Sequence, residues 1–313
     1  MPTSDQPTVE FAAVQEPTTE EPPDAKSAAG QPAAQERRAG GRPGRNLPAA
    51  AGVGLVLGAI AIATLFTIKV IFLVYVAAFV AVALWELGRA FGSRDIRVPL
   101  PPVAVGGAAM LALAYWQGER ALVAAFGVSV VGVLAWRLAG PATGYVRDVT
   151  AGIFALAYLP LLASFVALML AAPDGARRSL VFLVVTVCSD VGGYFVGSFL
   201  AGGLLGRHLM VPLISPKKTW EGFAGSAAAC LAGGAIVLPT LLHAAAWQGV
   251  LVGAAALATA TLGDLAESMM KRDLGIKDMG TVLPGHGGVL DRLDSLLVTA
   301  PVVWLLLMVF LPS

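Results

Sequence analysis

The sequence predicts an all-α, polytopic integral membrane protein with about nine transmembrane helices. Of its 313 residues, 57% are hydrophobic and only 13% are charged, whereas a soluble domain carries about 25% charged residues. After Pro48, apolar stretches of about 20 residues, the length that crosses a bilayer, follow one another closely. The expected spans are 49–67, 69–88, 99–116, 121–138, 149–172, 179–200, 222–242, 246–263 and 296–312.

Single residues within this pattern predict how the spans are joined and packed. Little more than Lys69 separates the first two spans, so we expect a tight helical hairpin there. Pro160 lies inside the fifth span and should kink it, which neighbouring helices can tolerate. In the sixth span, Gly193 and Gly197 have the spacing that lets another helix or a substrate approach closely.

The chain divides by composition into three regions. Residues 1–48 are rich in Pro, Ala, Glu, Gln and Thr, with Phe11 as their only aromatic residue. Such a segment buries too little apolar area to offset its ordering entropy, so we expect a disordered N-terminal tail. The rest divides into N-terminal transmembrane helices, 49–178, and a C-terminal transmembrane region, 179–313, with polar loops at 201–221 and 264–295.

The distribution of basic residues predicts the orientation in the membrane. Lys and Arg are retained preferentially in the cytoplasm. With a cytoplasmic N-terminus, all of the 21 Lys and Arg residues fall inside except Lys69, Arg120, Arg177 and Arg178. We therefore expect a multi-pass protein of the plasma membrane whose N-terminal tail and two polar loops are cytoplasmic.

The start of the last polar loop carries four polar residues at helical spacing. If the eighth helix continues past Gly263, then Asp264, Glu267, Ser268 and Lys271 share one helical face. Two carboxylates, a hydroxyl and an ammonium group can hold a divalent cation and a phosphate together. The alternative is a solvated interfacial face with a salt bridge.

A glycine-rich turn, Pro284-Gly-His-Gly-Gly, follows in the same loop. Its side-chain bulk is almost confined to His286, so the backbone of Gly287 and Gly288 can approach a ligand and cradle phosphate oxygens. A helix is expected to begin near Val289, with its positive end towards the turn.

Acidic and basic residues surround this turn. Asp291 and Asp294 lie one helical turn apart, and hard carboxylate oxygens suit Mg²⁺. The sequence has no Cys/His ligand set, so zinc is not expected. Four cationic side chains flank the turn, Lys271, Arg272, Lys277 and Arg292.

The other polar loop carries candidates for binding a triphosphate or a lipid phosphate. Positive-inside anchoring would explain its two lysines, but not the hydroxyl and carboxyl groups beside them. The candidates are Ser215, Lys217, Lys218, Thr219 and Glu221.

Two carboxylates lie in or beside apolar spans. Asp190 is expected inside the sixth span, where a charge costs about 2.5–3.5 kcal/mol, so it should face a polar cavity or a partner. A helix-packing seam with a buried hydrogen bond is the alternative. Glu86, at the end of the second span, is either functional or simply interfacial and paired with Arg89 or Arg137.

The C-terminal motifs resemble those of the phosphatidate cytidylyltransferases, also called CDP-diacylglycerol synthases. The resemblance covers about 186–295. It lies in Ser189-Asp-x-Gly-x-Tyr, in Ser215-Pro-Lys-Lys-Thr-Trp-Glu-Gly, in Ser268-Met-Met-Lys-Arg-Asp-Leu-Gly-Ile-Lys-Asp and in Leu-Pro-Gly-His-Gly-Gly-Val-Leu-Asp-Arg-Leu-Asp, which ends at Asp294.

The resemblance implies that CTP and phosphatidic acid react to give CDP-diacylglycerol and pyrophosphate. It also implies Mg²⁺, with room for a second cation, a homodimer in the membrane, and no nucleic acid partner. Region 179–313 would be catalytic, with Asp264, Asp291, Lys271 and Asp294 as catalytic residues and Asp264 and Asp291 as metal ligands. Substrates would meet Asp190, Ser215, Lys217, Lys218, Thr219, Glu221, Ser268, Arg272, Lys277, His286, Gly287, Gly288 and Arg292.

The residue chemistry agrees with this expectation. Attack by a phosphate oxygen on the α-phosphorus of CTP needs charge neutralisation and in-line positioning more than a covalent nucleophile. Two other interpretations remain open at this point: a CTP-dependent lipid-alcohol kinase of the polyprenol type, and an ion-coupled transporter that uses Asp190 and Glu86.

Overall fold

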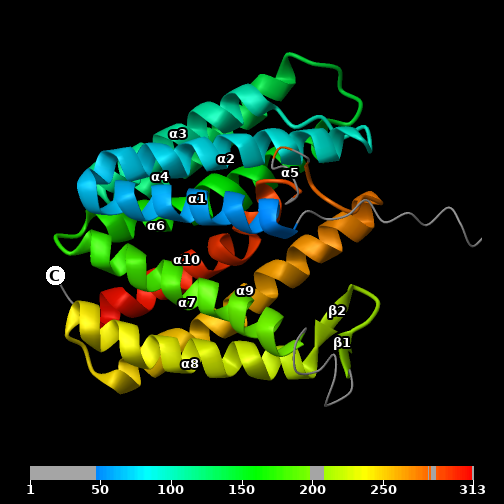
Figure 1. Ribbon diagram of the computed structural model, residues 1–313. Helices are drawn as coiled ribbons and strands as arrows, with labels where there is room; N and C mark the ends of the chain where they lie inside the picture. The colour runs from blue at the N-terminus through cyan, green and yellow to red at the C-terminus, as the bar shows by residue number, and fades with distance from the viewer. Residues whose placement is uncertain (1–46, 198–207, 281, 283–286, 312–313) are drawn as a thin grey trace, which may run out of the picture. The chain divides into compact units, whose positions relative to one another are not determined.

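The protein is a bundle of helices with one short hairpin of two strands (Figure 1). The computed structural model describes residues 47–197, 208–280, 282 and 287–311. They belong to one compact unit, Arg45–Ser313. The predicted tail, 1–48, lies almost wholly outside the described residues, and its disorder stays a prediction, as does the boundary between 178 and 179.

The helices follow the predicted spans closely. The first four are α1 (Leu47–Thr67), α2 (Lys69–Gly92), α3 (Leu100–Gln117) and α4 (Glu119–Leu138). A longer helix consists of α5 (Tyr145–Leu156), a π-helical turn (Ala157–Leu161) and α6 (Leu162–Ala171). After α7 (Gly175–Phe195) come strands β1 (Leu209–Val211) and β2 (Ser215–Thr219), then α8 (Trp220–Leu242), α9 (Ala246–Leu274) and α10 (Leu290–Phe310).

Within the described residues, seven of these helices are long and apolar enough to cross a membrane. They are α2, α4, the continuous helix Tyr145–Ala171, α7, α8, α9 and α10. In α1, the part Gly54–Thr67 forms a shorter apolar helix. Helix α3 is not among the seven candidate spans. The expectation of an all-α, polytopic membrane protein is therefore confirmed.

The predicted tight hairpin is also confirmed, and the predicted position of a kink, Pro160, carries a local distortion of the helix. Ile68 alone separates α1 from α2, and the Tyr75 hydroxyl donates a hydrogen bond to the Leu57 carbonyl oxygen across this hairpin (3.1 Å). Pro160 lies in the π-helical turn, where the missing proline N–H interrupts the regular ladder. The Ser164 hydroxyl donates a hydrogen bond to the Pro160 carbonyl oxygen (2.7 Å), and the helix continues beyond the distortion as α6.

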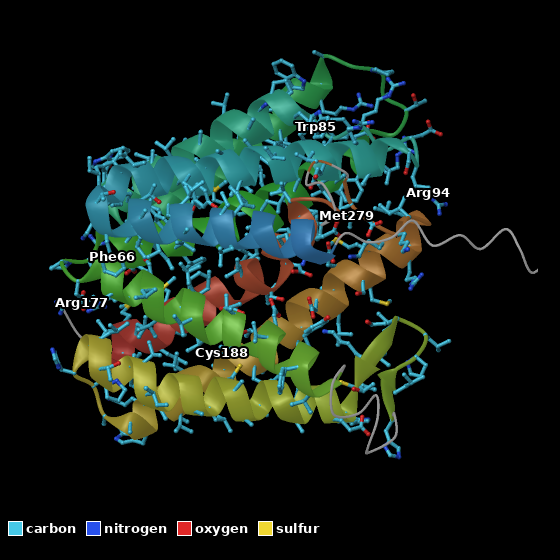
Figure 2. All side chains as sticks on the ribbon, viewed as in Figure 1. Phe66, Trp85, Arg94, Arg177, Cys188 and Met279 are labelled. Carbon is cyan, nitrogen blue, oxygen red and sulfur yellow. The ribbon has the colours of Figure 1, made fainter. Side chains whose placement is uncertain are left out.

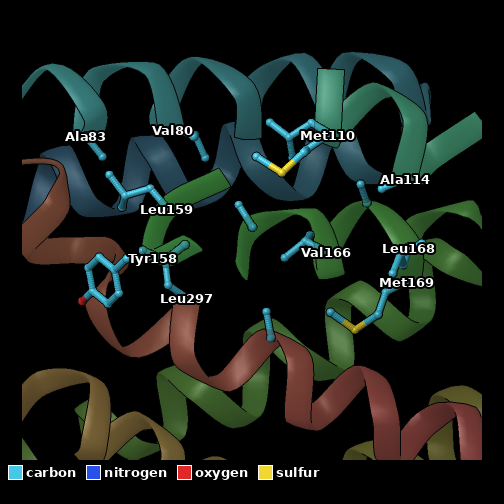
Figure 3. Packing of buried hydrophobic residues seen from close by; sticks show 14 of the residues in the cluster. Val80, Ala83, Met110, Ala114, Tyr158, Leu159, Val166, Leu168, Met169 and Leu297 are labelled. Atoms are coloured by element: carbon cyan, nitrogen blue, oxygen red, sulfur yellow. The ribbon is translucent and has the colours of Figure 1, made fainter. Parts of the chain in front are cut away.

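The buried core is apolar and joins the two halves of the chain. Val80 of α2, Met110 of α3 and Val166 of α6 belong to one cluster with Leu297 of α10 (Figure 3). Elsewhere, small residues set the helix spacing, since a Cβ atom at Gly193 would lie 2.6 Å from the Ser226 hydroxyl oxygen of α8. The predicted close approach of another helix at Gly193 is thus confirmed.

Polar contacts identify two ends of the bundle. At one end, the Lys69 ammonium bonds to the Ala172 carbonyl oxygen (2.6 Å). At the other, Arg94 Nε donates to the Leu274 carbonyl oxygen (3.0 Å), which joins the end of α2 to the end of α9. Arg94 and Arg177 accordingly lie at opposite ends in Figure 2. We call the end at Arg94 and Leu274 the site end.

The predicted polar loop 264–295 is mostly helical. Helix α9 continues to Leu274 and ends at Gly275, whose φ of 70° provides a left-handed cap. Helix α10 begins at Leu290, one residue after the predicted start. The polar residues before Gly275 belong to α9. Residues 275–289 join α9 to α10, and we call them the connecting segment.

Candidate active site

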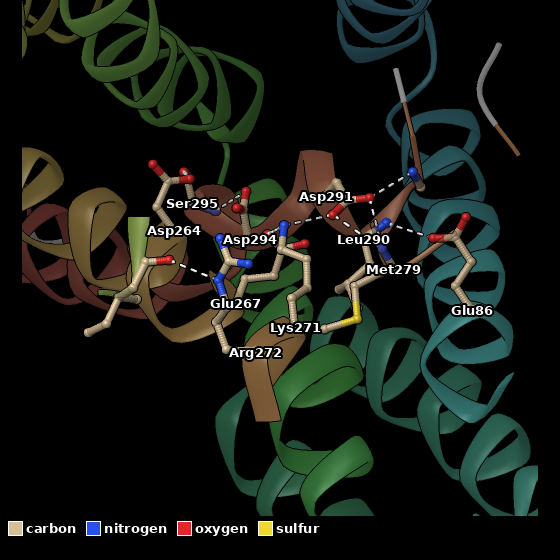
Figure 4. Close-up of polar contacts among 12 residues, drawn as sticks. Glu86, Asp264, Glu267, Lys271, Arg272, Met279, Leu290, Asp291, Asp294 and Ser295 are labelled. Atoms are coloured by element: carbon tan, nitrogen blue, oxygen red, sulfur yellow. Dashed lines mark hydrogen bonds and ion pairs between the residues drawn. The ribbon is translucent and has the colours of Figure 1, made fainter. Parts of the chain in front are cut away.

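A close contact between α9 and α10 forms the centre of the site. A Cβ atom at Gly263 would lie 3.0 Å from the Asp294 carbonyl carbon and 3.1 Å from the Ser295 Cα atom, so glycine allows the two helices to touch. The Ser295 hydroxyl donates to Asp264 Oδ1 (3.2 Å). The carboxyl groups of Asp264 and Asp294 lie within hydrogen-bonding reach of each other (Figure 4).

Strand β2 supplies a cation to this pair. Lys218 Nζ lies 2.7 Å from Asp264 Oδ2, and it also approaches the Thr261 carbonyl oxygen (3.4 Å). The Lys218 side chain is 23% exposed and the Asp264 side chain is 36% exposed, so the pair is accessible. Arg272 Nε donates to the Ile214 carbonyl oxygen (3.4 Å) and links the hairpin to α9. The two predicted polar loops therefore meet.

A second cluster surrounds Lys271, about two helical turns beyond Asp264 on α9. The ammonium group pairs with Glu267 and with Asp291 Oδ1, the latter at 2.9 Å. Asp291 Oδ2 accepts the backbone N–H groups of Gly288 (2.7 Å) and Met279 (3.2 Å). These bonds tie the start of α10 to the connecting segment. Lys271 is thus held in place between two carboxylates.

Glu86 of α2 is a site residue that sequence reasoning did not assign. Its side chain is buried, and Oε2 accepts the N–H of Leu290 at the start of α10 (2.9 Å). A Cβ atom at Gly280 would collide with the Glu86 carboxyl group, and one at Gly288 would lie 2.7 Å from Oε2. Glu86 therefore supports the middle of the connecting segment and its end at α10. The sequence feature that could have indicated this role is the position of Glu86, an acidic residue in an otherwise apolar stretch.

The expectation that Glu86 pairs with Arg89 or Arg137 is wrong. The Arg89 guanidinium lies over the Trp85 ring (4.9 Å to its centroid). Arg137 Nε pairs with Asp148 Oδ2 (3.0 Å). Both arginines thus have partners of their own, whereas Glu86 turns towards α10.

Other predicted residues lie around these clusters. Asp190 lies in the last turns of α7 rather than at the centre of a span, because α7 begins at Gly175, and it is in electrostatic contact with Asp264, Lys218 and Arg292. Arg292 is exposed in the first turn of α10.

Two of the other residues predicted in loop 201–221 have local partners. The Thr219 hydroxyl caps α8 by accepting the Gly222 N–H (3.1 Å). Glu221 Oε1 lies 2.6 Å from His208 Nδ1. Ser215 is half-buried at the start of β2, and the Lys217 side chain lies outside the described residues.

Three other predicted residues lie on α9 or in the connecting segment, and a fourth is not described. Ser268 is half-buried on α9, and Lys277 is exposed in the connecting segment. Gly287 has a φ of 85°, a conformation that glycine adopts readily. His286 lies outside the described residues.

The donor groups fit a magnesium ion that shares its ligands with substrate. Among the residues described, no group of three or more His, Cys, Asp or Glu side chains could hold a metal. Mg²⁺ is usually bound through one or two carboxylates, waters and substrate phosphates. The adjacent carboxyl groups of Asp264 and Asp294 meet that requirement. Asp291, predicted as the second ligand, accepts hydrogen bonds from Lys271 and two backbone N–H groups, and its role as a metal ligand stays a prediction.

The fold and the site define a helical membrane protein with a cluster of acidic and basic groups at one end of its bundle. The chain belongs to the cytidylyltransferase family, whose sequence model matches residues 49–310. It is therefore a nucleotidyltransferase.

Two curated relatives match over most of their length, and a third matches over less than half. The phosphatidate cytidylyltransferase of Mycobacterium leprae (strain TN) is 42% identical over 282 residues, 85% of this chain and 89% of the relative. That of Mycobacterium bovis is 40% identical over 296 residues, 90% and 94% of the two chains. That of Brucella suis biovar 1 is 46% identical over 129 residues, 41% of this chain and 46% of the relative.

Proposed function

We propose that the protein transfers the cytidylyl group of CTP to phosphatidic acid, giving CDP-diacylglycerol and pyrophosphate. The relatives named phosphatidate cytidylyltransferase support this substrate pair. The observation that carries the proposal is the meeting of Asp264, Asp294 and Lys218 at the site end, beside Lys271 and Asp291. Acidic groups for a cation and cationic groups for phosphates are the requirements of this transfer.

The reaction exchanges one phosphoric anhydride for another. A phosphatidate oxygen attacks the α-phosphorus of CTP, the bond from that phosphorus to the bridging oxygen breaks, and pyrophosphate leaves with the electron pair. The nucleophile is already anionic, so no side chain needs to form a covalent intermediate. The protein must bring two polyanions together and neutralise their charge.

Each cluster has a part in this task. Bound Mg²⁺ would supply positive charge to the phosphates, held by Asp264 together with Asp294, with Asp291 as the alternative second ligand and room for a second cation. Lys218 is paired with an accessible carboxylate, so a phosphate can compete for it. Lys271 is oriented by Glu267 and Asp291 and presents a fixed charge. Arg272 and Arg292 are exposed beside them.

The membrane topology proposed is nine spans in the plasma membrane, with a cytoplasmic N-terminus and a cytoplasmic site. The excess of basic residues on that side supports the orientation. The contact of Arg94 with the end of α9 and that of Lys218 with Asp264 support a common side for both polar segments. This side is where a lipid phosphate and a soluble nucleotide can meet. The proposed homodimer rests on the family resemblance.

The test uses the full chain in detergent with labelled CTP, phosphatidic acid and Mg²⁺. We expect pyrophosphate release and label in the lipid, both dependent on phosphatidate and Mg²⁺. Asp264→Asn should abolish both products, while Asp273→Asn, on the exposed side of α9, should retain them. Pyrophosphate release no faster than with Asp264→Asn would contradict the proposal. Release of CDP would instead identify a kinase.

A further inference from the structure

An apolar groove leads from the site end into the membrane-spanning part of the bundle. It has a volume of about 890 Å³ and is lined by residues of α1, α2, α6, α7 and α10, with a single residue of α8. Among the described residues that line it, Arg292 is the one charged side chain. Tyr75 is also a lining residue, and its hydroxyl donates a hydrogen bond to the Leu57 carbonyl oxygen. The wall therefore offers few partners to water.

The groove has a direction. Of the lining residues on α10, Arg292 is the first, and it follows Asp291 of the site in the sequence. From there the lining follows α10 through Leu296 to Ala300, a rise of about 12 Å along the helix axis. On α1, the lining residues run from Gly54 to Ile62. A ligand that fills the groove would have an anionic head at Arg292 and a hydrocarbon tail against α1 and α7.

Of the two substrates, only the lipid has both parts. We infer that the groove binds an acyl chain of the phosphatidate substrate, with the lipid phosphate at the Arg292 end. A guanidinium group suits phosphate oxygens, and burial of each methylene group against an apolar wall is favourable. This inference rests on the proposed function and adds the place of the lipid tail. The other occupants, a bulk phospholipid or a helix of a second copy, are outcomes of the test.

Gly58 gives a way to fill the groove without disturbing the fold. It lines the groove, and a Cβ atom there meets no other atom within 4 Å. In Gly58→Leu, the new side chain occupies space that a long acyl chain would use. Gly127 of α4 is a matched control, since it also has no neighbour within 4 Å and is not part of the lining.

The first measurement compares dioleoyl and dihexanoyl phosphatidate. We expect Gly58→Leu to raise the KM for the long-chain lipid about tenfold, because about two methylene groups lose their contacts. The KM values for the short-chain lipid and for CTP should stay as in the unsubstituted protein, and Gly127→Leu should change none of them. An equal change for both chain lengths, or no change for either, would overturn the inference.

The second measurement needs no turnover. A phosphatidate with a diazirine near the end of one acyl chain should label residues of α1 and α7, and unlabelled phosphatidate should compete. Gly58→Leu should reduce this labelling. Equal labelling by a phosphatidylcholine probe would identify a bulk-lipid groove, and labelling elsewhere would exclude the groove. If labelling succeeds but no pyrophosphate is released by the unsubstituted protein, the proposed reaction fails and the lipid site stands.

Discussion

The Glu86 carboxylate accepts a hydrogen bond from the backbone N–H of Leu290 (2.9 Å), across more than two hundred residues of chain. Glu86 belongs to α2, and Leu290 begins the helix that carries Asp291 and Asp294. The same carboxyl group is packed against Gly280 and Gly288. The N-terminal helices thus help to position the connecting segment and the acidic start of α10.

Glu86→Ala should lower kcat by at least about tenfold. The substitution leaves the buried Leu290 N–H without its acceptor, an effect of about 1–3 kcal/mol, and opens space beside the two glycines. Glu86→Gln keeps an acceptor oxygen and should recover most of the activity. Glu119→Ala, an exposed residue of α4, is the control. Equal losses in the Ala and Gln variants would show that the charge matters and not the hydrogen bond.

Asp264→Asn and Asp294→Asn should each lower the rate about 100-fold or more, because a bound cation contributes several kcal/mol of charge stabilisation. The Mg²⁺ concentration for half-maximal rate should rise in any residual activity. Titration of Mg²⁺ also decides between the two possible ligand pairs. If Asp291→Asn raises the Mg²⁺ requirement and Asp294→Asn leaves it unchanged, the pair is Asp264 with Asp291.

Lys271→Met should destabilise the protein as well as inactivate it. Lys271 stands between Glu267 and Asp291, whose side chains are 2% and 8% exposed, so its removal leaves two buried carboxylates without their cation. Breaking a buried pair in this way costs about 3–5 kcal/mol. Thermal unfolding in detergent should show a lower Tm than for Lys277→Met, which removes an exposed charge. Identical Tm values would contradict this role.

Much of the site was predictable from local spacing. The positions of Asp264, Glu267 and Lys271 follow from a single helical repeat, and the structure continues α9 through all three. The helix start near Val289 follows from the end of the glycine-rich turn. Such features depend on neighbours in sequence, which the chain itself displays.

Contacts between distant segments were not predictable in the same way. Nothing in the spacing of Asp264 indicates that Lys218, on another element, lies 2.7 Å away. The partner of Glu86 depends on how α2 packs against α10, and the sequence near Glu86 offered Arg89 as an equally reasonable partner. Helix packing decides these pairs, so a single sequence identifies the groups without their arrangement.

Gly263→Ala tests the packing that creates the central carboxylate pair. The added methyl group would meet the backbone of Asp294 and Ser295, which cannot rotate away as a flexible side chain could. Overpacking of this kind costs about 1–3 kcal/mol and shifts the helices apart. We expect a lower Tm and at least about tenfold lower activity with a raised Mg²⁺ requirement, because Asp264 moves away from Asp294. Gly127→Ala, at an open position of α4, should change neither. Normal activity in Gly263→Ala would mean that the site does not require this contact.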